Sequence, residues 1–551
     1  MQNIFINIEN NESHIHSFDN DGEISYDTFS LENERYSFFI QGIILNKQEV
    51  INGYGISEFN SFLFGKVILN LHFINSLRGS FYGFLNDKIQ KKISIFNDQL
   101  GTKCIYYYSK SNKVLVSSCY SVFLDEVKVL NEEGARMLLS YGYMLNNSTI
   151  LKDVLKLIPG SILTIDYKES SELRISAEQY FRFSISKLSN EDEHQAIDQL
   201  DVLFRRAVNR QFDKDKEYKK KHFVALSGGL DSRMTAWVAH DIGFFDQVNF
   251  TFSQSDYWDE EIAKKIASDL RHDWIFKFLD NGNFLYDIDE IVNISGGNVL
   301  YYGLAHSNSF LKLLNFGKLG ILHSGQLGDV VVGSFIKDFD NNTLNSRGGE
   351  YSKLGSKIFF FEKQYSSFEE KEIDMIYQRG LNGANSGLTL INNYTETFSP
   401  FYDIDFMEFC LSLPIKMRMG HNLYKKWILS RYPGAARYVW ESTGRKIDTK
   451  ELRLNIKGRQ IFITDLKDSF LRKLKLIKSP IATRHNMNPL QYWYDTNEDL
   501  RSFLDNYYAD NILLLKNSEL RGVAVRLFER GSAIEKNQVL SLIALVKRLN
   551  N

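Results

Sequence analysis

Cysteine is scarce in this chain of 551 residues, and long apolar runs are missing. The three cysteines, Cys104, Cys119 and Cys410, are too few and too scattered for a disulfide framework or a zinc site. The N-terminus has no basic segment followed by an apolar one, and no stretch reaches the ~18 apolar residues that a membrane helix needs. These absences argue against a secreted or membrane-inserted protein, and we expect a cytoplasmic location.

An excess of one charge is also missing. The formal net charge is −2, which gives no general attraction to nucleic acid or to anionic membranes. We therefore expect no nucleic-acid partner. Proline is rare as well, with six residues and none between Pro159 and Pro400, so the central block is free to form regular helices and strands. The length exceeds what one core supports and predicts two to four domains.

Residues 221–240 carry the clearest motif. The apolar run 223–226 predicts a buried strand, SGGLDS follows at 227–232, and residues 234–240 have helical spacing. A strand, a glycine-rich turn and a helix N-terminus form a cradle for anions, because backbone N–H groups converge there. Asp231 adds an oxygen ligand suited to Mg²⁺ against phosphate.

The pattern of strand, turn and helix recurs downstream. Residues 247–253 predict a second strand that ends in the hydroxyl of Ser253, and a helix with one apolar face follows from Asp259. Residues 319–329 then repeat a strand, a glycine-rich turn and an aspartate, Asp329. Alternating strands and helices predict a parallel sheet, whose ligands lie at the carboxyl ends of the strands.

The first part of the chain, residues 1–185, is rich in short apolar or alternating runs separated by turn residues, which is typical of strands. The expected strands are residues 36–45, 79–85, 92–96, 105–108 and 113–118. A charged helix over residues 192–212 then leads into the second part, residues 190–551.

SGGLDS matches neither the Walker nor the Rossmann pattern. It resembles the pyrophosphate-binding loop of ATP pyrophosphatases, in the form found in the asparagine synthetase family. The resemblance extends over nearly the whole chain. It implies an α/β protein with an N-terminal Ntn-type αββα sandwich (1–185) that is glutaminase-like, and a C-terminal parallel α/β synthetase domain of ATP-pyrophosphatase type with extra helices (190–551). The implied cofactors are ATP and Mg²⁺.

The resemblance also implies site residues. Asp231 and Asp329 would hold the metal, and Lys426, with Lys425 as the alternative, would stabilise charge during adenylation. The implied catalytic residues are Lys426, Asp231, Asp329 and Gln326. The implied nucleotide-binding residues are Leu226, Ser227, Gly228, Gly229, Leu230, Asp231, Ser232, Ser253 and Gly325.

Three departures from the family change the expected chemistry. The chain begins Met1-Gln2-Asn3, without the N-terminal cysteine that hydrolyses glutamine, so we expect an inactive glutaminase unless the start is mis-assigned. Gln326 stands where the family has Glu or Tyr, and an amide cannot take a proton. Val330 replaces the acidic residue that follows the aspartate in asparagine synthetases, so asparagine synthesis becomes doubtful.

Other segments are less informative. Residues 336–395 predict helices and loops around the acceptor pocket. Asp403 is expected to cap a helix over 407–413, and residues 424–429 and 537–549 are expected to be helical, the latter amphipathic. Residues 445–485 carry twelve Lys or Arg and four acids, which favours a solvated face over a site for an anionic partner.

We therefore predict an ATP-dependent amide ligase that adenylates a small-molecule or peptide carboxylate and lets an amine attack it. The amine could be free ammonia, the product of another amidase, or part of the substrate, as in β-lactam synthetases and lasso peptide cyclases. A precursor peptide or carrier protein could then be a partner. A silent homologue that binds nucleotide or a partner, and a nucleic-acid-modifying enzyme, are the other classes considered. The oligomeric state, the substrates and the role of residues 445–485 cannot be deduced from the sequence.

Overall fold

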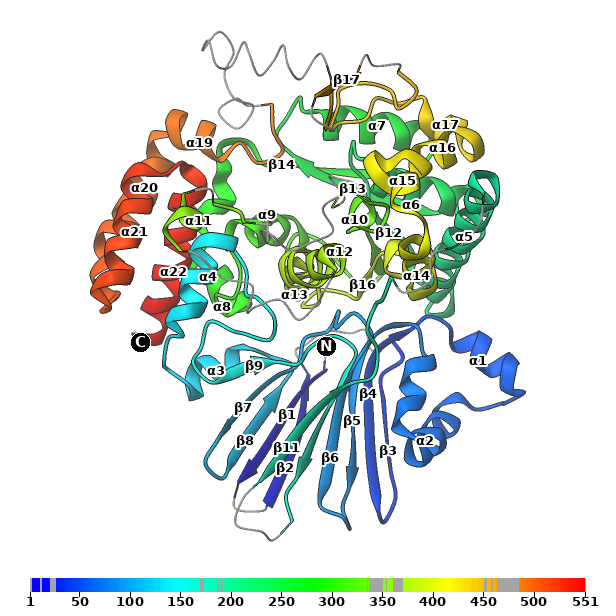
Figure 1. Ribbon diagram of the computed structural model, residues 1–551, viewed down its shortest axis with the longest axis vertical. Coiled ribbons are helices and arrows are strands. Elements are labelled where there is room, and N and C mark those ends of the chain that lie inside the picture. The colour runs from blue at the N-terminus through cyan, green and yellow to red at the C-terminus, as the bar shows by residue number, and fades with distance from the viewer. Residues whose placement is uncertain are drawn as a thin grey trace.

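Figure 1 shows the computed structural model of the chain, with an antiparallel β-sandwich below and a larger α/β part above. The structure describes residues 2–9, 12–19, 26–168, 173–185, 189, 192–333, 335, 350–352, 354–359, 370–449, 453–456, 459–462 and 485–550. Most of the basic stretch 445–485, and much of 336–395, lie outside these residues.

Two antiparallel sheets form the sandwich. The first has the order β2-β1-β8-β7-β9, and the second has the order β11-β10-β6-β5-β4-β3. The strands of the first sheet are β1 (Gln2–Glu9), β2 (Glu12–Asp19), β7 (Tyr106–Lys110), β8 (Lys113–Ser117) and β9 (Val154–Lys156). Those of the second are β3 (Phe29–Glu32), β4 (Tyr36–Ile44), β5 (Gly79–Asp87), β6 (Lys92–Asn97), β10 (Ser161–Asp166) and β11 (Arg174–Gln179). The five strands expected from the sequence are all present within two residues of their predicted bounds.

Alternation of side chains explains the layers. Ile4, Ile6 and Ile8 of β1 share one face and pack into a core between the two sheets. Phe38 and Ile40 of β4 point to the opposite face, where they pack under α1 (Lys47–Tyr54) and α2 (Phe59–Leu69). On the far side, α3 (Ser121–Glu126) and α4 (Glu132–Tyr141) cover the first sheet. The expected αββα sandwich is confirmed.

The second part contains a five-stranded sheet of parallel strands in the order β14-β13-β12-β15-β16. Its strands are β12 (Lys221–Ala225), β13 (Gln247–Ser253), β14 (Asp273–Phe278), β15 (Leu319–His323) and β16 (Thr397–Phe398). Val224 and Ile321 face a core shared with α5 (Glu193–Glu217), α6 (Leu230–Asp241) and α7 (Trp258–Leu270). Phe223 and Leu322 face the opposite core, beside α9 (Tyr302–Leu311). The expected parallel α/β architecture is confirmed.

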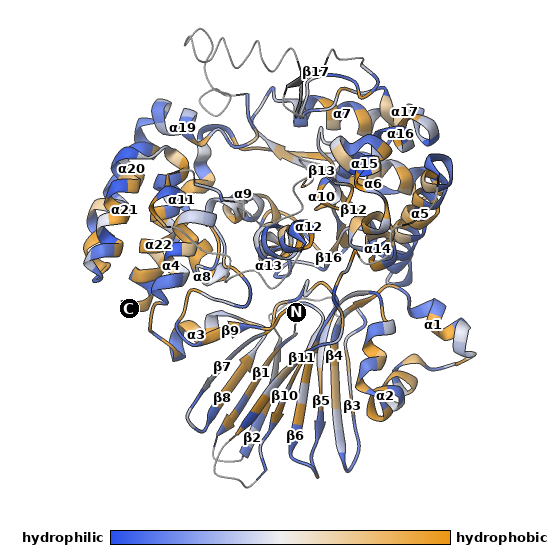
Figure 2. Cartoon of the chain, viewed as in Figure 1, coloured by the Kyte–Doolittle hydropathy of each residue, from blue (hydrophilic) through white to orange (hydrophobic). Residues whose placement is uncertain are grey.

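Helices complete both sides of this sheet. They include α8 (Ile288–Ser295), α12 (Lys371–Met375), α13 (Leu388–Ile391), α14 (Ile404–Ser412), α15 (Ile415–Arg418), α16 (Asn422–Arg431), α17 (Pro433–Ala436), α19 (Leu490–Thr496), α20 (Glu498–Asn511), α21 (Ser518–Arg530) and α22 (Ala533–Asn550). In Figure 2 hydrophilic and hydrophobic residues alternate along α5, α20 and α21, as in helices with one face on a core. Within the described residues, no helix is both long enough and apolar enough to cross a membrane.

Helices of the two parts of the chain pack against each other. Helix α4 belongs to the first 185 residues, yet it contacts α22 and α21 near the C-terminus (Figure 1). The C-terminal helix α22 in turn packs on α8. A boundary between residues 185 and 190 separates the two sheet systems, but the contacts of α4 with α21 and α22 cross it. The proposed domain boundary therefore stays a prediction.

Candidate active site

The glycine-rich turn lies at the carboxyl end of the central strand β12. Ser232 Oγ accepts a hydrogen bond from the backbone N–H of Ser227 (3.0 Å) and lies 2.8 Å from Ser227 Oγ. The N–H of Gly229 donates to Ser227 Oγ (3.2 Å). The two serines therefore hold the turn in shape from within, while Leu226 and Leu230 anchor its two ends in the core.

A carboxylate that sequence reasoning missed completes the turn. Asp259, in the first turn of α7, accepts a hydrogen bond from the N–H of Gly228 (2.7 Å). Burial raises the pKa of Asp259 to about 6, and the nearby Glu441 also raises it, while the bond from Gly228 opposes both. The sequence does show an acidic residue at the start of the helix after β13, but no sequence pattern links that residue to Gly228.

Asp329 lies beside Asp231, and the expectation that the two carboxylates hold a metal stays a prediction. Asp231 Oδ2 accepts a hydrogen bond from the backbone N–H of Asp329 (2.9 Å). Burial raises the pKa of Asp231 to about 7, and the negative charge of Asp329 raises it further, while Tyr424 and the Asp329 N–H oppose the shift. A divalent cation between the two carboxylates would offset this repulsion, so the donor set fits Mg²⁺.

Two glycines permit this approach of the loops. A Cβ atom on Gly328 would lie 2.5 Å from Cγ of Asp231, and one on Gly325 would lie 2.2 Å from the backbone nitrogen of Ser232. Both distances are shorter than any real Cβ contact, so any other residue would push the loop after β15 away from SGGLDS. The glycines of the second motif are therefore required by packing between the two motifs.

The side chain of Gln326 connects the second motif to a neighbouring segment of the chain. Its Nε2 donates to the carbonyl of Ala384 (2.5 Å), directly beyond the π-helix η4 (Ile376–Gly383). Ser253 is fully buried, and its hydroxyl donates to the carbonyl of Gln254 (3.0 Å). Gln326 therefore lies at the site, as expected, while the hydroxyl of Ser253 is engaged elsewhere.

The structure does not bring Lys426 to the aspartates. Its ammonium pairs with Glu193 at the start of α5, and both side chains are about two-fifths exposed, 43% and 41%. Its neighbour Lys425 lies over the ring of Trp440, at 5.3 Å from the centroid. Burial lowers the pKa of His421, the negative charge of Asp329 opposes this shift, and the charge of Lys425 adds to it.

Arg233, the residue directly after SGGLDS, was also missed. Its fully buried guanidinium donates to the carbonyls of Gly228 (2.9 Å) and Val439 (2.6 Å), and to that of Ala435 (3.1 Å). Burial lowers the pKa of Arg233 to about 10, so it stays charged at neutral pH. Arg233 ties the segment after α17 over the turn, where the N–H of Glu441 donates to the carbonyl of Gly228 (3.2 Å).

A pocket of about 420 Å³ opens beside Asp329 and Gln326. Its walls come from the end of α4, from α9 and from the π-helix η4, so residues of the first 185 contribute to it. Within the region 336–395, the described segments 350–352 and 370–395 contribute to the walls of this pocket, and its role as an acceptor pocket stays a prediction.

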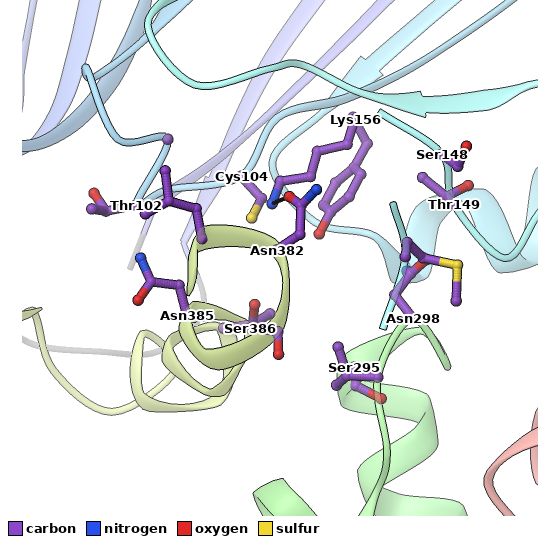
Figure 3. A pocket seen from close by; sticks show the side chains of 16 residues that line it. Thr102, Cys104, Ser148, Thr149, Lys156, Ser295, Asn298, Asn382, Asn385 and Ser386 are labelled. Carbon is purple, nitrogen blue, oxygen red and sulfur yellow. Dashed lines mark hydrogen bonds between the residues drawn. The ribbon is translucent and has the colours of Figure 1, made fainter. Parts of the chain in front are cut away.

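A smaller cavity of about 40 Å³ lies between the sandwich and the upper part. Figure 3 shows that polar side chains line it from both parts, with Thr102, Cys104, Ser148, Thr149 and Lys156 on one side and Ser295, Asn298, Asn382, Asn385 and Ser386 on the other. Lys156 Nζ donates to Asn382 Oδ1 (3.1 Å). Ser386 lines both cavities, which therefore adjoin.

The N-terminal strand β1 begins in a hydrogen-bonded cluster. Ser118 Oγ accepts from the N–H of Ile4 (3.1 Å) and donates to Asn3 Oδ1 (3.0 Å), and the hydroxyl of Tyr82 bonds Gln41 and Ser118. Cys119 directly follows Ser118, with its Sγ 3.0 Å from Ser121 Oγ, and Cys104 lines the cavity between the parts.

Comparison with known proteins supports the nature of the sandwich. Residues 27–181 match the family model described as a glutamine amidotransferase domain. A comparison with curated proteins finds no match.

Solved structures resemble the chain only weakly. They include glutamine phosphoribosylpyrophosphate amidotransferase from B. subtilis complexed with ADP and GMP, at 12% identity and a TM-score of 0.20, covering 44% of this chain and 58% of that one. A structure described as the allosteric regulatory enzyme of purine biosynthesis has 10% identity and a TM-score of 0.22, covering 50% and 74%. NMN synthetase from Francisella tularensis has 12% identity and a TM-score of 0.20, covering 42% and 97%. At these scores the architecture rests on the chain's own structure.

Proposed function

We propose that this chain, which carries a glutamine amidotransferase-type domain, is an ATP-dependent ligase of the asparagine synthetase kind that forms amide bonds and releases AMP and pyrophosphate. The observation that carries the proposal is the pair Asp231 and Asp329, held together on two glycine-rich turns at the carboxyl ends of adjacent parallel strands. That edge of a parallel sheet is where such folds bind ligands.

The proposed reaction has two steps. A carboxylate oxygen of the substrate attacks the α-phosphorus of ATP, and the bond to pyrophosphate breaks. An amine then attacks the acyl carbon of the adenylate, AMP leaves with the oxygen, and the amine loses a proton. Adenylation is needed because a free carboxylate is a poor electrophile. The amide of Gln326 cannot accept the released proton, so we assign it to the leaving AMP or to water.

Mg²⁺ would be held by Asp231 and Asp329, where it would neutralise charge on the leaving pyrophosphate. The protein's own contribution is positional. The turn 226–232 would hold the phosphates, with Asp259 and Arg233 fixing its backbone. We assign Lys425, rather than Lys426, to the charge that develops during both steps, because Lys426 is paired with Glu193.

The amine does not come from glutamine hydrolysed by this chain's own sandwich in our proposal. Beside the start of β1, the side chain of Asn3 is occupied by a hydrogen bond from Ser118. Ammonia from solution, ammonia from another protein and an amine on the substrate itself all remain compatible, the last making the chain a cyclase.

A screen for pyrophosphate release tests the proposal. The protein, ATP and Mg²⁺ are combined with a panel of carboxylic acids, with ammonium or glutamine as nitrogen source. We expect release that depends on the acid, is indifferent to glutamine and is lost in Asp231→Asn. Asp273→Asn, an exposed aspartate on β14, is the matched control and should be unaffected. ATP binding without release for any acid would favour a nucleotide-binding homologue, and turnover with glutamine would contradict the inactive sandwich.

A further inference from the structure

The pocket beside Asp329 is large for an amino acid. Its volume of about 420 Å³ falls in the range of pockets that bind drug-sized ligands, roughly 300–1,000 Å³. A substrate the size of aspartate would leave most of it filled with water. Since the proposed adenylation takes place at its Asp329 end, the remainder of the pocket would hold the body of the acid.

Four tyrosines are among the residues that line the walls. The rings of Tyr141 and Tyr143, from the end of α4, lie edge to face with centroids 5.9 Å apart. Tyr302 and Tyr351 form a second pair, with centroids 6.3 Å apart. Faces and hydroxyls of this kind suit a ring-shaped body with some polar edges, because aromatic walls offer flat contact and hydrogen bonds together.

Few charged residues line the pocket. Among the described residues that line it, Arg379 is the only cation and Asp329 the only acid. In the proposed function the carboxylate of Asp329 is assigned to the metal, while its backbone N–H donates to Asp231. Arg379 is exposed, no carboxylate among the described residues forms an ion pair with it, and its guanidinium lies 5.6 Å from the ring centroid of Phe335. With Asp329 assigned to the metal, the pocket offers Arg379 as the partner for a second anion.

The backbone around this arginine fixes its position. Arg379 is carried by the π-helix η4, a conformation that is rare and is often found at functional sites. Gln326 donates to Ala384 just beyond the end of this helix, and Leu327 packs beside Gly380 within it. The element that carries Arg379 is therefore fixed against the turn that carries Asp329.

From this arrangement we propose that the acyl substrate is a ring-bearing acid with a second anionic group, bound by Arg379, rather than a small zwitterionic amino acid. The proposal deepens the proposed function and rests on it for the role of the Asp329 end. The substrate carboxylate to be activated would face Asp329, its ring would lie among the tyrosines, and its second anion would reach the guanidinium. The second anion could be a carboxylate or a phosphate.

Matched pairs of probes separate these features. Binding is measured by calorimetry without ATP for benzoate against isophthalate, and for glucuronate against glucuronate 1-phosphate, with L-aspartate as the amino-acid probe. We expect the doubly anionic member of at least one pair to bind about tenfold to a hundredfold more tightly than its partner. The pair that shows the preference identifies the second anion. Tightest binding of L-aspartate, or equal binding within both pairs, would overturn the proposal.

Variants of the chain test whether Arg379 causes the preference for the doubly anionic probe. Arg379→Gln should abolish it, Arg379→Lys should keep part of it, and Arg526→Gln, an arginine on α21 far from the pocket in sequence, should leave it intact. Gly303→Leu should weaken binding of all ring probes without unfolding the chain, because a Cβ added there meets no atom within 4 Å and the residue lies in a helix. A preference that survives in Arg379→Gln would contradict the assignment.

The two proposals fail separately. Binding that depends on Arg379, without pyrophosphate release from ATP, would refute the ligase function and leave the pocket's specificity standing. Pyrophosphate release driven best by L-aspartate would support the ligase function and refute the substrate class.

Discussion

Gly328 is the residue of the second motif that lies against the side chain of Asp231. A Cβ there would lie 2.5 Å from Cγ of Asp231, whereas one on Gly53 in α1 would meet no atom within 4 Å. We predict that Gly328→Ala costs about 1–3 kcal/mol in the free energy of unfolding and weakens Mg²⁺-dependent ATP binding. Gly53→Ala should instead stabilise the chain slightly, since alanine is the better helix former. Thermal melts with and without Mg-ATP measure both, and equal behaviour of the two variants would contradict the packing argument.

The neighbouring lysines of α16 give a second prediction at this scale. Lys425→Ala should reduce the rate of pyrophosphate release by about 10²–10³-fold, the usual effect of removing a group that stabilises transition-state charge. Lys426→Ala should change that rate little, and its half-exposed ion pair with Glu193 should contribute no more than about 1 kcal/mol to stability. The reverse ranking in steady-state kinetics would restore Lys426 as the catalytic lysine.

At the scale of elements, strands and turns could be predicted and the pocket could not. Apolar runs bounded by turn residues predicted β13 at its observed bounds and β4 to β8 within two residues. This was possible because the apolar side chains that bury each strand stand in the strand's own sequence. Asp403 is observed as the predicted cap, its side chain accepting from the N–H of Phe406 (3.2 Å). It also binds Arg210 of α5 (2.6 Å), which sequence spacing could not reveal.

The π-helix and the tyrosine walls depend on tertiary assembly. The sequence predicted only helices and loops over 336–395, with no sign of a π-helix at 376–383. Tyr141 lies 161 positions before Tyr302 in the chain, counted from their numbers (302 − 141). The segment after α4 meets the segment before α9 through a bridge between Tyr143 and Val299, which brings the rings into one pocket. For the same reason, the pairing of Asp259 with Gly228 and the exposure of Lys426 could not be read from local patterns.

For the whole molecule, a buried ion pair joins the two parts. Lys103, in the turn before β7, pairs with Glu396 beside β16 at 2.8 Å, and the two side chains are 4% and 3% exposed. Lys103→Met should destabilise the chain by about 3–5 kcal/mol, because it leaves Glu396 buried and unpaired. The double variant Lys103→Met with Glu396→Leu should recover most of that loss. Denaturant unfolding of the three proteins tests this, and a double variant as unstable as the single one would contradict it.

Buried histidines make the stability of the molecule depend on pH. Burial lowers the pKa of His306 to about 4, while the unfolded chain titrates near 6.5. As pH falls from 6.5 to 4, the unfolded state takes up a proton that the folded state does not, so stability is lost over this window. The loss from this residue is on the order of 3 kcal/mol. His306→Gln should flatten the dependence and exposed His14→Gln should not, as measured by denaturant unfolding from pH 7 to 4.

The nucleotide products test the central claim most directly. The protein is incubated with ATP, Mg²⁺ and the most active acid of the panel, and AMP, ADP, phosphate and pyrophosphate are quantified by chromatography. We predict AMP and pyrophosphate in equal amounts, formed only when the acid is present and absent with Asp231→Asn. Formation of ADP and phosphate instead would show that the carboxylate is activated by phosphorylation, and would contradict the proposal that Asp231 and Asp329 act on a leaving pyrophosphate.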